Sequence, residues 1–188
     1  SSLAQIMIPS SVTSIGRGAF YFCSSLEQIT IPYSVTSIGN YAFNNCSKLK
    51  QITIPSSVNS VGELLFCCCP LNTITIVELN EQRIKYYDNQ LLIYKSNPNN
   101  KIYDTLLWSN LTIKESKIPP FITRIGCGAY YKCSLLTQVT IPSSVTSIGG
   151  FAFGECSSLT QITIPCSVTS IENYAFSECS SLTQITIP

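Results

Sequence analysis

The stretch SSVTSIGGFAFGECSSLTQITIP, residues 143–165, is one complete copy of a repeat that runs through the chain. Copies of this stretch end on Ile-Pro pairs, and within two groups the pairs lie 23 residues apart: Ile8, Ile31 and Ile54, then Ile118, Ile141, Ile164 and Ile187. One copy is shorter, because Leu71 follows Leu49 by 22 residues. A fixed period of this length is the signature of a solenoid in which each copy forms one coil.

Each part of the repeat predicts a local structure. The segment LTQITI (159–164) has apolar residues at its first, fourth and sixth positions, which is the strand pattern of leucine-rich repeats. Pro165 ends this strand, because proline cannot donate to a ladder. The segment SVTSIG is a second short extended piece, and FAFGEC fits one helical or 3₁₀ turn with Ala, Phe and Cys facing inward.

No copy can bury its apolar face alone, so neighbouring copies must stack. We therefore predict a β-rich, α/β-type leucine-rich-repeat solenoid, right-handed and built of eight 23-residue coils. We expect it to carry a parallel sheet on one face, with short strands and helical turns elsewhere.

An insertion interrupts the repeat after Ile76. Residues 77–117 hold 11 of the chain's 21 charged side chains and its only Trp. The segments QLLIYK (90–95) and KIYDTLLW (101–108) resemble strands, and SNPNN between them is typical of a turn. TIKESKIP (112–119) then restores a degenerate coil with Ser116 where an Ile is expected. We predict one solenoid, residues 1–188, made of repeats 1–76 and 113–188 with a hairpin-containing insertion at 77–112.

The two ends of the sequence fall at the same point of the repeat, SSLAQIMIP at the start and SSLTQITIP at the finish. Solenoids normally carry polar capping repeats, and none is evident here. We therefore expect a segment of a longer array. Its end coils would present unpaired edges that favour end-to-end self-association.

Composition limits the partners. The net charge is +1, which gives no electrostatic case for nucleic acid. No apolar run approaches 18 residues, so we expect no membrane span.

The cysteines follow the repeat rather than a chemical motif. Six of the ten occupy one inward position, and we expect them to form a column of buried thiols: Cys23, Cys46, Cys69, Cys133, Cys156 and Cys179. The other four, Cys67, Cys68, Cys127 and Cys166, lie off this column, and we expect partial exposure. The chain has no His, which removes the Ser-His and Cys-His catalytic arrangements. We predict no catalytic residues, no cofactor and no metal site.

Two surfaces are candidates for binding a protein or glycan. On the strand face, Thr and Gln dominate, and the N-terminal half adds charge at Glu27 and Lys50 beside Gln28 and Gln51. The alternative is that these polar residues only solubilise the strands and stabilise them slightly. In the insertion the candidates are Tyr94, Tyr103 and Trp108, residue types that favour interfaces. The alternative there is a covering element, in which some rings pack on the solenoid.

Two glycosylation sequons occur, NCS at Asn45 and NLT at Asn110. Asn45 lies beside the cysteine column. Asn110, next to the insertion, is the candidate site.

The unit IPSSVTSIGGFAFGECSSLTQIT resembles the BspA-type leucine-rich repeat, also called the Treponema pallidum class. The hairpin resembles a variant interleaved among such repeats, with LLIY (91–94) and TLLW (105–108) in its strand positions. The resemblance covers essentially the whole chain and implies a surface or secreted protein of a mucosal microbe, bacterial or protozoan. It also implies adhesion to host cells or extracellular matrix, without catalytic residues.

Three functions are therefore weighed. The first is a non-catalytic surface protein that mediates adhesion or protein–protein interaction. The second is an intracellular, cytoplasmic scaffold, which cysteines of a reduced core would favour. The third, an enzyme, has no constellation of residues to support it.

Overall fold

The computed structural model describes residues 4–77, 83–97, 99 and 101–187. Four parallel strands line one face of its first half: β1 (Gln5–Met7), β3 (Gln28–Thr30), β5 (Gln51–Pro55) and β7 (Thr73–Val77). Gln5 pairs with Gln28 and Gln28 with Gln51, so this sheet is in register at the 23-residue period. At the shorter copy Gln51 pairs with Thr73, which shows that the sheet absorbs the one-residue slip.

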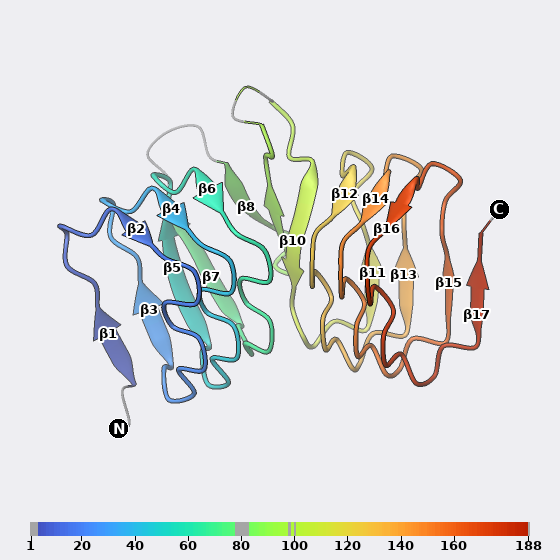
Figure 1. The fold of residues 1–188 in the computed structure, drawn as a ribbon, viewed down its shortest axis with the longest axis horizontal. Helices are drawn as coiled ribbons and strands as arrows, with labels where there is room; N and C mark the ends of the chain where they lie inside the picture. The colour runs from blue at the N-terminus through green and yellow to red at the C-terminus, as the bar shows by residue number, and fades with distance from the viewer. Residues whose placement is uncertain (1–3, 78–82, 98, 100, 188) are drawn as a thin grey trace.

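The same face continues in the second half in two pairs of strands. β11 (Glu115–Lys117) pairs with β13 (Gln138–Thr140), and β15 (Gln161–Thr163) pairs with β17 (Gln184–Thr186), all parallel. Figure 1 shows the two repeat blocks on either side of the insertion. The predicted leucine-rich-repeat solenoid of stacked coils with parallel sheets is confirmed.

A second, narrower set of strands comes from the SVTSIG segments. In the first half it comprises β2 (Ser14–Ile15), β4 (Ser37–Ile38) and β6 (Ser60–Val61), and in the second half β12 (Arg124–Ile125), β14 (Ser147–Ile148) and β16 (Ser170–Ile171). A serine before four of these strands (β4, β6, β14 and β16) ties its coil to the preceding one. Ser34 and Ser57 donate to the carbonyls of Val12 and Val35 at 2.6 and 2.9 Å. The serines of the repeat thus join coils as well as solubilise them.

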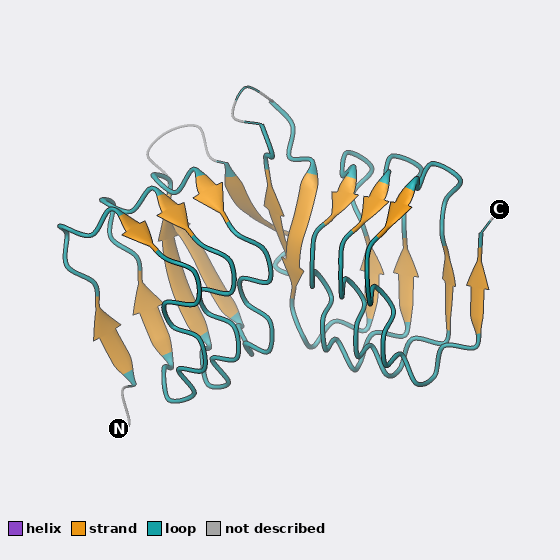
Figure 2. Cartoon of the chain, viewed as in Figure 1, coloured by secondary structure: helices purple, strands orange, loops and turns teal. Residues whose placement is uncertain are grey.

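The predicted helical turn in FAFGEC is wrong: the described residues contain no helix, and these segments are turns (Figure 2). Gly154 N–H donates to Phe151 O within the coil at 2.9 Å, whereas Phe153 N–H donates to Ala175 O of the next coil at 2.8 Å. In a helix, the N–H groups after the first turn would bond within the segment. Here alternate N–H groups instead hold neighbouring coils together.

Two left-handed residues in each turn explain this alternation. Phe151 and Glu155 have φ of 54° and 57°. The same two positions have positive φ in six coils: Gly18, Tyr41, Leu64, Gly128, Phe151 and Tyr174, and Phe22, Asn45, Cys68, Lys132, Glu155 and Glu178. Left-handed conformations cannot continue a right-handed helix. Only two of these residues are glycine, so the side chains themselves gave no signal of the conformation.

The insertion contains the predicted hairpin of β9 (Leu91–Tyr94) and β10 (Thr105–Ser109), which pair antiparallel. A third strand that the sequence pattern does not predict, β8 (Ile84–Tyr87), pairs with β9. Asp88, Asn89 and Gln90 connect β8 to β9. Asp88 and Asn89 have φ of 52° each, as the two central residues of a type I′ turn require, and Gln90 N–H donates to Tyr87 O at 3.1 Å. β10 also pairs with β12, so the hairpin extends the narrow sheet of β12, β14 and β16 and does not project from the solenoid.

Side chains of the hairpin enter both halves of the core. Leu92 and Trp108 are buried with the first repeat block, whereas Leu91, Ile93 and Leu106 are buried with the second. Successive side chains of a strand point to opposite faces, so one thin hairpin closes both cores.

An exposed ion pair also spans the two blocks. Arg124 lies 3.2 Å from Glu63 and 3.7 Å from Glu172. All three side chains are about half exposed, so we expect the cluster to add little to stability.

Candidate functional site

The structure brings four of the predicted binding residues together on the strand face. Glu27 and Lys50 lie in adjacent coils, because Lys50 N–H donates to Glu27 O at 2.9 Å. Gln28 and Gln51 lie beside them as partners in the β3–β5 register. Together with Ala4 and Gln5 they line an open groove of about 250 Å³, which we call the strand-face groove.

The charges of the strand-face groove are available to a partner. Glu27 and Lys50 are exposed, and neither has an ion pair among the described residues. The two side chains offer one negative and one positive group on neighbouring coils, flanked by amides that both donate and accept. Such a surface can complement the charges and hydrogen-bonding groups of another molecule.

The two tyrosines predicted in the insertion are half-buried and already in contact with cations. The Arg83 guanidinium lies 4.8 Å from the centre of the Tyr94 ring, and Lys95 Nζ lies 5.1 Å from that of Tyr103. The Tyr94 hydroxyl donates to Asn59 O at 3.3 Å, and burial raises the pKa of this hydroxyl. One face of each ring is therefore used inside the protein.

Trp108 does not belong to an exposed surface. Its side chain is 3% exposed and packs edge-to-face on Phe66, with ring centroids 6.4 Å apart. Its indole nitrogen has no hydrogen-bond partner among the described residues. The expectation that Trp108 contacts a partner fails because the ring fills the core beneath β10.

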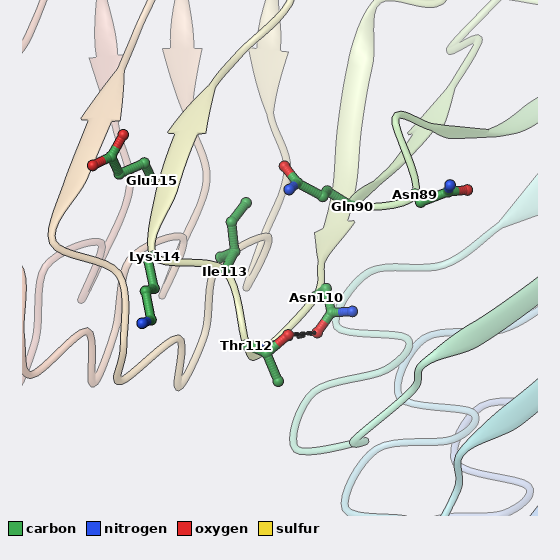
Figure 3. A pocket seen from close by; sticks show the side chains of 7 residues that line it. All are labelled: Asn89, Gln90, Asn110, Thr112, Ile113, Lys114 and Glu115. Atoms are coloured by element: carbon green, nitrogen blue, oxygen red, sulfur yellow. Dashed lines mark hydrogen bonds between the residues drawn. The ribbon is translucent and has the colours of Figure 1, made fainter.

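A second open groove, which the sequence pattern does not predict, lies between β11 and the hairpin (Figure 3). Its volume is about 490 Å³. We call it the hairpin groove, and its lining residues are Asn89, Gln90, Asn110, Thr112, Ile113, Lys114 and Glu115. No period predicts this groove, because its two sides come from the insertion and from the first coil after it.

Asn110 lies in the hairpin groove and not on a free loop. Its Oδ1 accepts hydrogen bonds from Thr112 N and Thr112 Oγ1, at 3.0 and 2.9 Å (Figure 3). The sequon thus forms a closed turn, with Asn110 half-buried. At the other sequon, Asn45 Nδ2 donates to Asn44 Oδ1 at 2.6 Å.

All ten cysteines are free thiols. The predicted column is present: its four inner members are buried, and Cys23 and Cys179 of the outer coils are half-buried. The structure adds a reason for cysteine at this position. Cys46 Sγ donates to Phe20 O at 3.1 Å and Cys69 Sγ to Phe43 O at 2.9 Å, so thiols hydrogen-bond the carbonyl of the preceding coil.

Off the column, Cys166 is exposed and Cys68 and Cys127 are partly exposed, as expected. Cys67 is buried, so the expectation of exposure is wrong for it. Its Sγ lies 4.0 Å from Gly128 O, where the two repeat blocks meet. Burial first, then the carboxylates of Glu63 and Glu172, raise the pKa of Cys127 to about 12. The Cys127 thiol therefore stays protonated and is a poor nucleophile at neutral pH.

Within residues 4–77, 83–97, 99 and 101–187, no group of three or more Cys, Asp or Glu side chains is arranged to hold a metal ion. The same residues include no helix with the length and apolar content of a membrane span.

Comparison with protein families gives one match over nearly the whole chain. Six copies of the BspA type leucine rich repeat region match residues 1–91 and 100–188. A search of curated protein sequences found no match.

Solved structures of bacterial leucine-rich-repeat proteins have the same fold. A leucine rich cell surface protein from Faecalibacterium prausnitzii is 28% identical with a TM-score of 0.74, and the match covers 97% of this chain and 59% of that one. A leucine-rich repeat protein from Bacteroides ovatus is 26% identical with a TM-score of 0.54, covering 99% and 46%.

The pneumococcal vaccine antigen PcpA is 24% identical with a TM-score of 0.78, covering 97% of this chain and 50% of that one, and at this identity it supports the fold alone. The chain therefore spans between about half and three fifths of the length of these structures.

Proposed function

Because the chain belongs to the BspA-type leucine-rich-repeat family, we propose that it is a non-catalytic surface protein that binds a partner through the strand-face groove. The observation that carries this proposal is the convergence of Glu27, Gln28, Lys50 and Gln51 in one open groove, where Glu27 and Lys50 have no ion pair within the described part of the chain. The partner class is a host protein or glycan of the cell surface or extracellular matrix. The surface location is supported by the similarity to the F. prausnitzii protein described as a cell surface protein.

A charge exchange tests the groove. Glu27→Lys combined with Lys50→Glu keeps the net charge and reverses the two charges. Immobilised wild-type protein is screened against purified matrix proteins and cell-surface glycans, and each ligand that binds is tested again with the double variant. We expect at least a tenfold loss of affinity, which corresponds to about 1.4 kcal/mol.

A matched control places the same two charges in the same strand column of the second block, as Thr160→Lys with Thr183→Glu. Both residues are exposed. Thr183 N–H donates to Thr160 O at 3.0 Å, just as Lys50 N–H donates to Glu27 O in the first block. The control should bind as wild type does. Equal binding by both variants, or no binding by the folded wild-type protein, would contradict the proposal.

The ten free thiols favour a second candidate, an intracellular scaffold, because reduced cysteines persist in reducing compartments. Thiol titration of the protein purified from its natural source separates the two locations. Ten titratable thiols together with intracellular antibody staining would favour the scaffold, whereas disulfides or a glycan at Asn110 would favour the surface.

A further inference from the structure

The parallel face of the solenoid is broken between β7 and β11. β7 is the last strand of the sheet β1-β3-β5-β7, and β11 is the first strand of the next one. The hairpin strands continue the second sheet through β10 and β12, and in this part of the chain no described strand pairs with the outer edge of β11. Figure 1 shows β11 separated from β7 by the hairpin.

The hydrogen bonds of β11 identify which of its backbone groups are unused. Lys114 O accepts from Thr137 N–H at 2.8 Å, and Ile118 N–H donates to Thr140 O at 3.1 Å, so these residues and Ser116 face β13. In a parallel strand, alternate residues direct their peptide groups to opposite neighbours. The N–H and C=O of Glu115 and Lys117 therefore point away from β13. These four groups have no hydrogen-bond partner among the described residues.

The unused edge lies beside the hairpin groove, which Glu115 itself lines. Across the groove lie Gln90 and Asn110, and in Figure 3 the Ile113 side chain lies between β11 and the hairpin. Glu115, Lys117 and Gln90 are exposed, so the groove is open to solvent. A row of unpaired strand groups beside an open groove is the geometry that accepts an added strand.

We propose that the outer edge of β11 binds an extended peptide segment of a partner protein, which adds as a strand in the hairpin groove. This deepens the proposed function, on which it rests, by naming a partner class and a second contact. The segment carries hydroxyl and amide side chains on its inward face, because that face meets the amides of Gln90 and Asn110. The lining of the groove includes no aromatic ring on which a sugar face would stack, which favours a peptide over a glycan.

Peptide binding to the wild-type chain is measured with a fluorescent, end-blocked TQTQTQT peptide. Two analogues are N-methylated at alternate residues, one set at odd and the other at even positions. Only one set of N–H groups can face β11, so we expect one analogue to lose at least tenfold in affinity and the other to bind normally. Backbone amide NMR signals of Glu115 and Lys117 should shift on binding, and those of Ser116 should shift less.

A variant of the chain tests the same edge from the other side. Glu115→Pro removes an outward N–H while leaving the bonds to β13, and Glu115→Ala is its matched control. We expect Glu115→Pro to weaken binding at least tenfold and Glu115→Ala to retain it. The peptide analogues still decide the question if the proline variant does not fold.

Three results would overturn the proposal. The first is no saturable peptide binding at millimolar peptide, and the second is an equal loss of affinity with both methylated analogues. The third is displacement of the peptide by a neutral oligosaccharide, if the Glu115→Pro variant binds that oligosaccharide as tightly as the wild-type protein does. The strand-face charge exchange should leave peptide binding unchanged. Failure of the strand-face proposal and failure of the edge proposal are therefore separate outcomes.

Discussion

The hydroxyl oxygens of Ser116 and Tyr130 lie 2.7 Å apart in the buried interior of the coil that follows the insertion. One repeat further on, the equivalent pair is the apolar β-branched Val139 and Phe153. The two polar residues therefore replace an apolar pair together, and each satisfies the other.

Removing one hydroxyl should cost more than removing both. Tyr130→Phe leaves Ser116 buried without its partner, and we expect a loss of about 1–3 kcal/mol in the free energy of unfolding. Adding Ser116→Ile restores the residues of the other coils and should recover most of that loss. Urea denaturation of the single and double variants measures the coupling. Additive effects would show that the two hydroxyls do not depend on each other.

The aromatic column of the core sets the cost of truncation. Phe153 is fully buried, and its ring stacks between Tyr130 and Phe176 at centroid distances of 5.1 and 5.3 Å. We expect Phe153→Ala to lower the free energy of unfolding by about 3–5 kcal/mol. Tyr174→Ala, at a ring that is 65% exposed, is the control and should cost less than about 1 kcal/mol. A loss below about 1 kcal/mol for Phe153→Ala would mean that the Phe153 side chain does not point into the core.

The left-handed turn positions predict an unusual substitution pattern. Glu178 has φ of 56° and is exposed, so its side chain contributes little to packing. Glu178→Val should destabilise by about 1–3 kcal/mol, because a β-branched residue is strained at positive φ. Glu178→Gly should change stability by less than about 1 kcal/mol. Thr183→Val, in the same coil, is the control without this strain. Equal thermal midpoints for both Glu178 variants would contradict the turn geometry.

Buried thiols limit stability at alkaline pH. Burial raises the pKa of Cys133 from 9.0 to about 12. A thiol whose pKa is raised in the folded state contributes its full stabilisation below about pH 9, its pKa in the unfolded chain. This stabilisation is lost as the pH rises toward and through the pKa of the folded state. Relative to Cys133→Ser, the wild-type protein should therefore lose roughly 2 kcal/mol between about pH 8 and about pH 10.5. Urea titrations of both proteins at the two pH values measure the difference, and parallel losses would exclude this thiol as a cause.

Much of the solenoid follows from single residues at the repeat positions. Ile52, Leu49 and Phe43 are all buried as the pattern predicts, because a period of stacked coils leaves each position only one environment. The strands of the hairpin were also predictable, since LLIY and TLLW are β-rich segments around a turn.

Other features depend on contacts that the repeat does not contain. Trp108 resembles an interface residue in sequence, yet it fills the space beside Phe66. Cys67 is buried because the second block packs over it near Gly128. The turn conformation at Lys132 or Phe151 is set by bonds to the next coil, and these residue types have no intrinsic preference for positive φ.

Leu91 and Leu92 are adjacent in the chain but are buried in different halves of the core. A plain repeat array gains stability only from nearest neighbours, so its ends can unravel while the middle stays intact. In this chain each block packs against one apolar face of the hairpin. Unfolding of either block would expose its face of the hairpin to water and so destabilise the hairpin against which the other block packs. The insertion thus makes the two blocks one cooperative folding unit, in which the middle of the array and not its ends governs the unfolding transition.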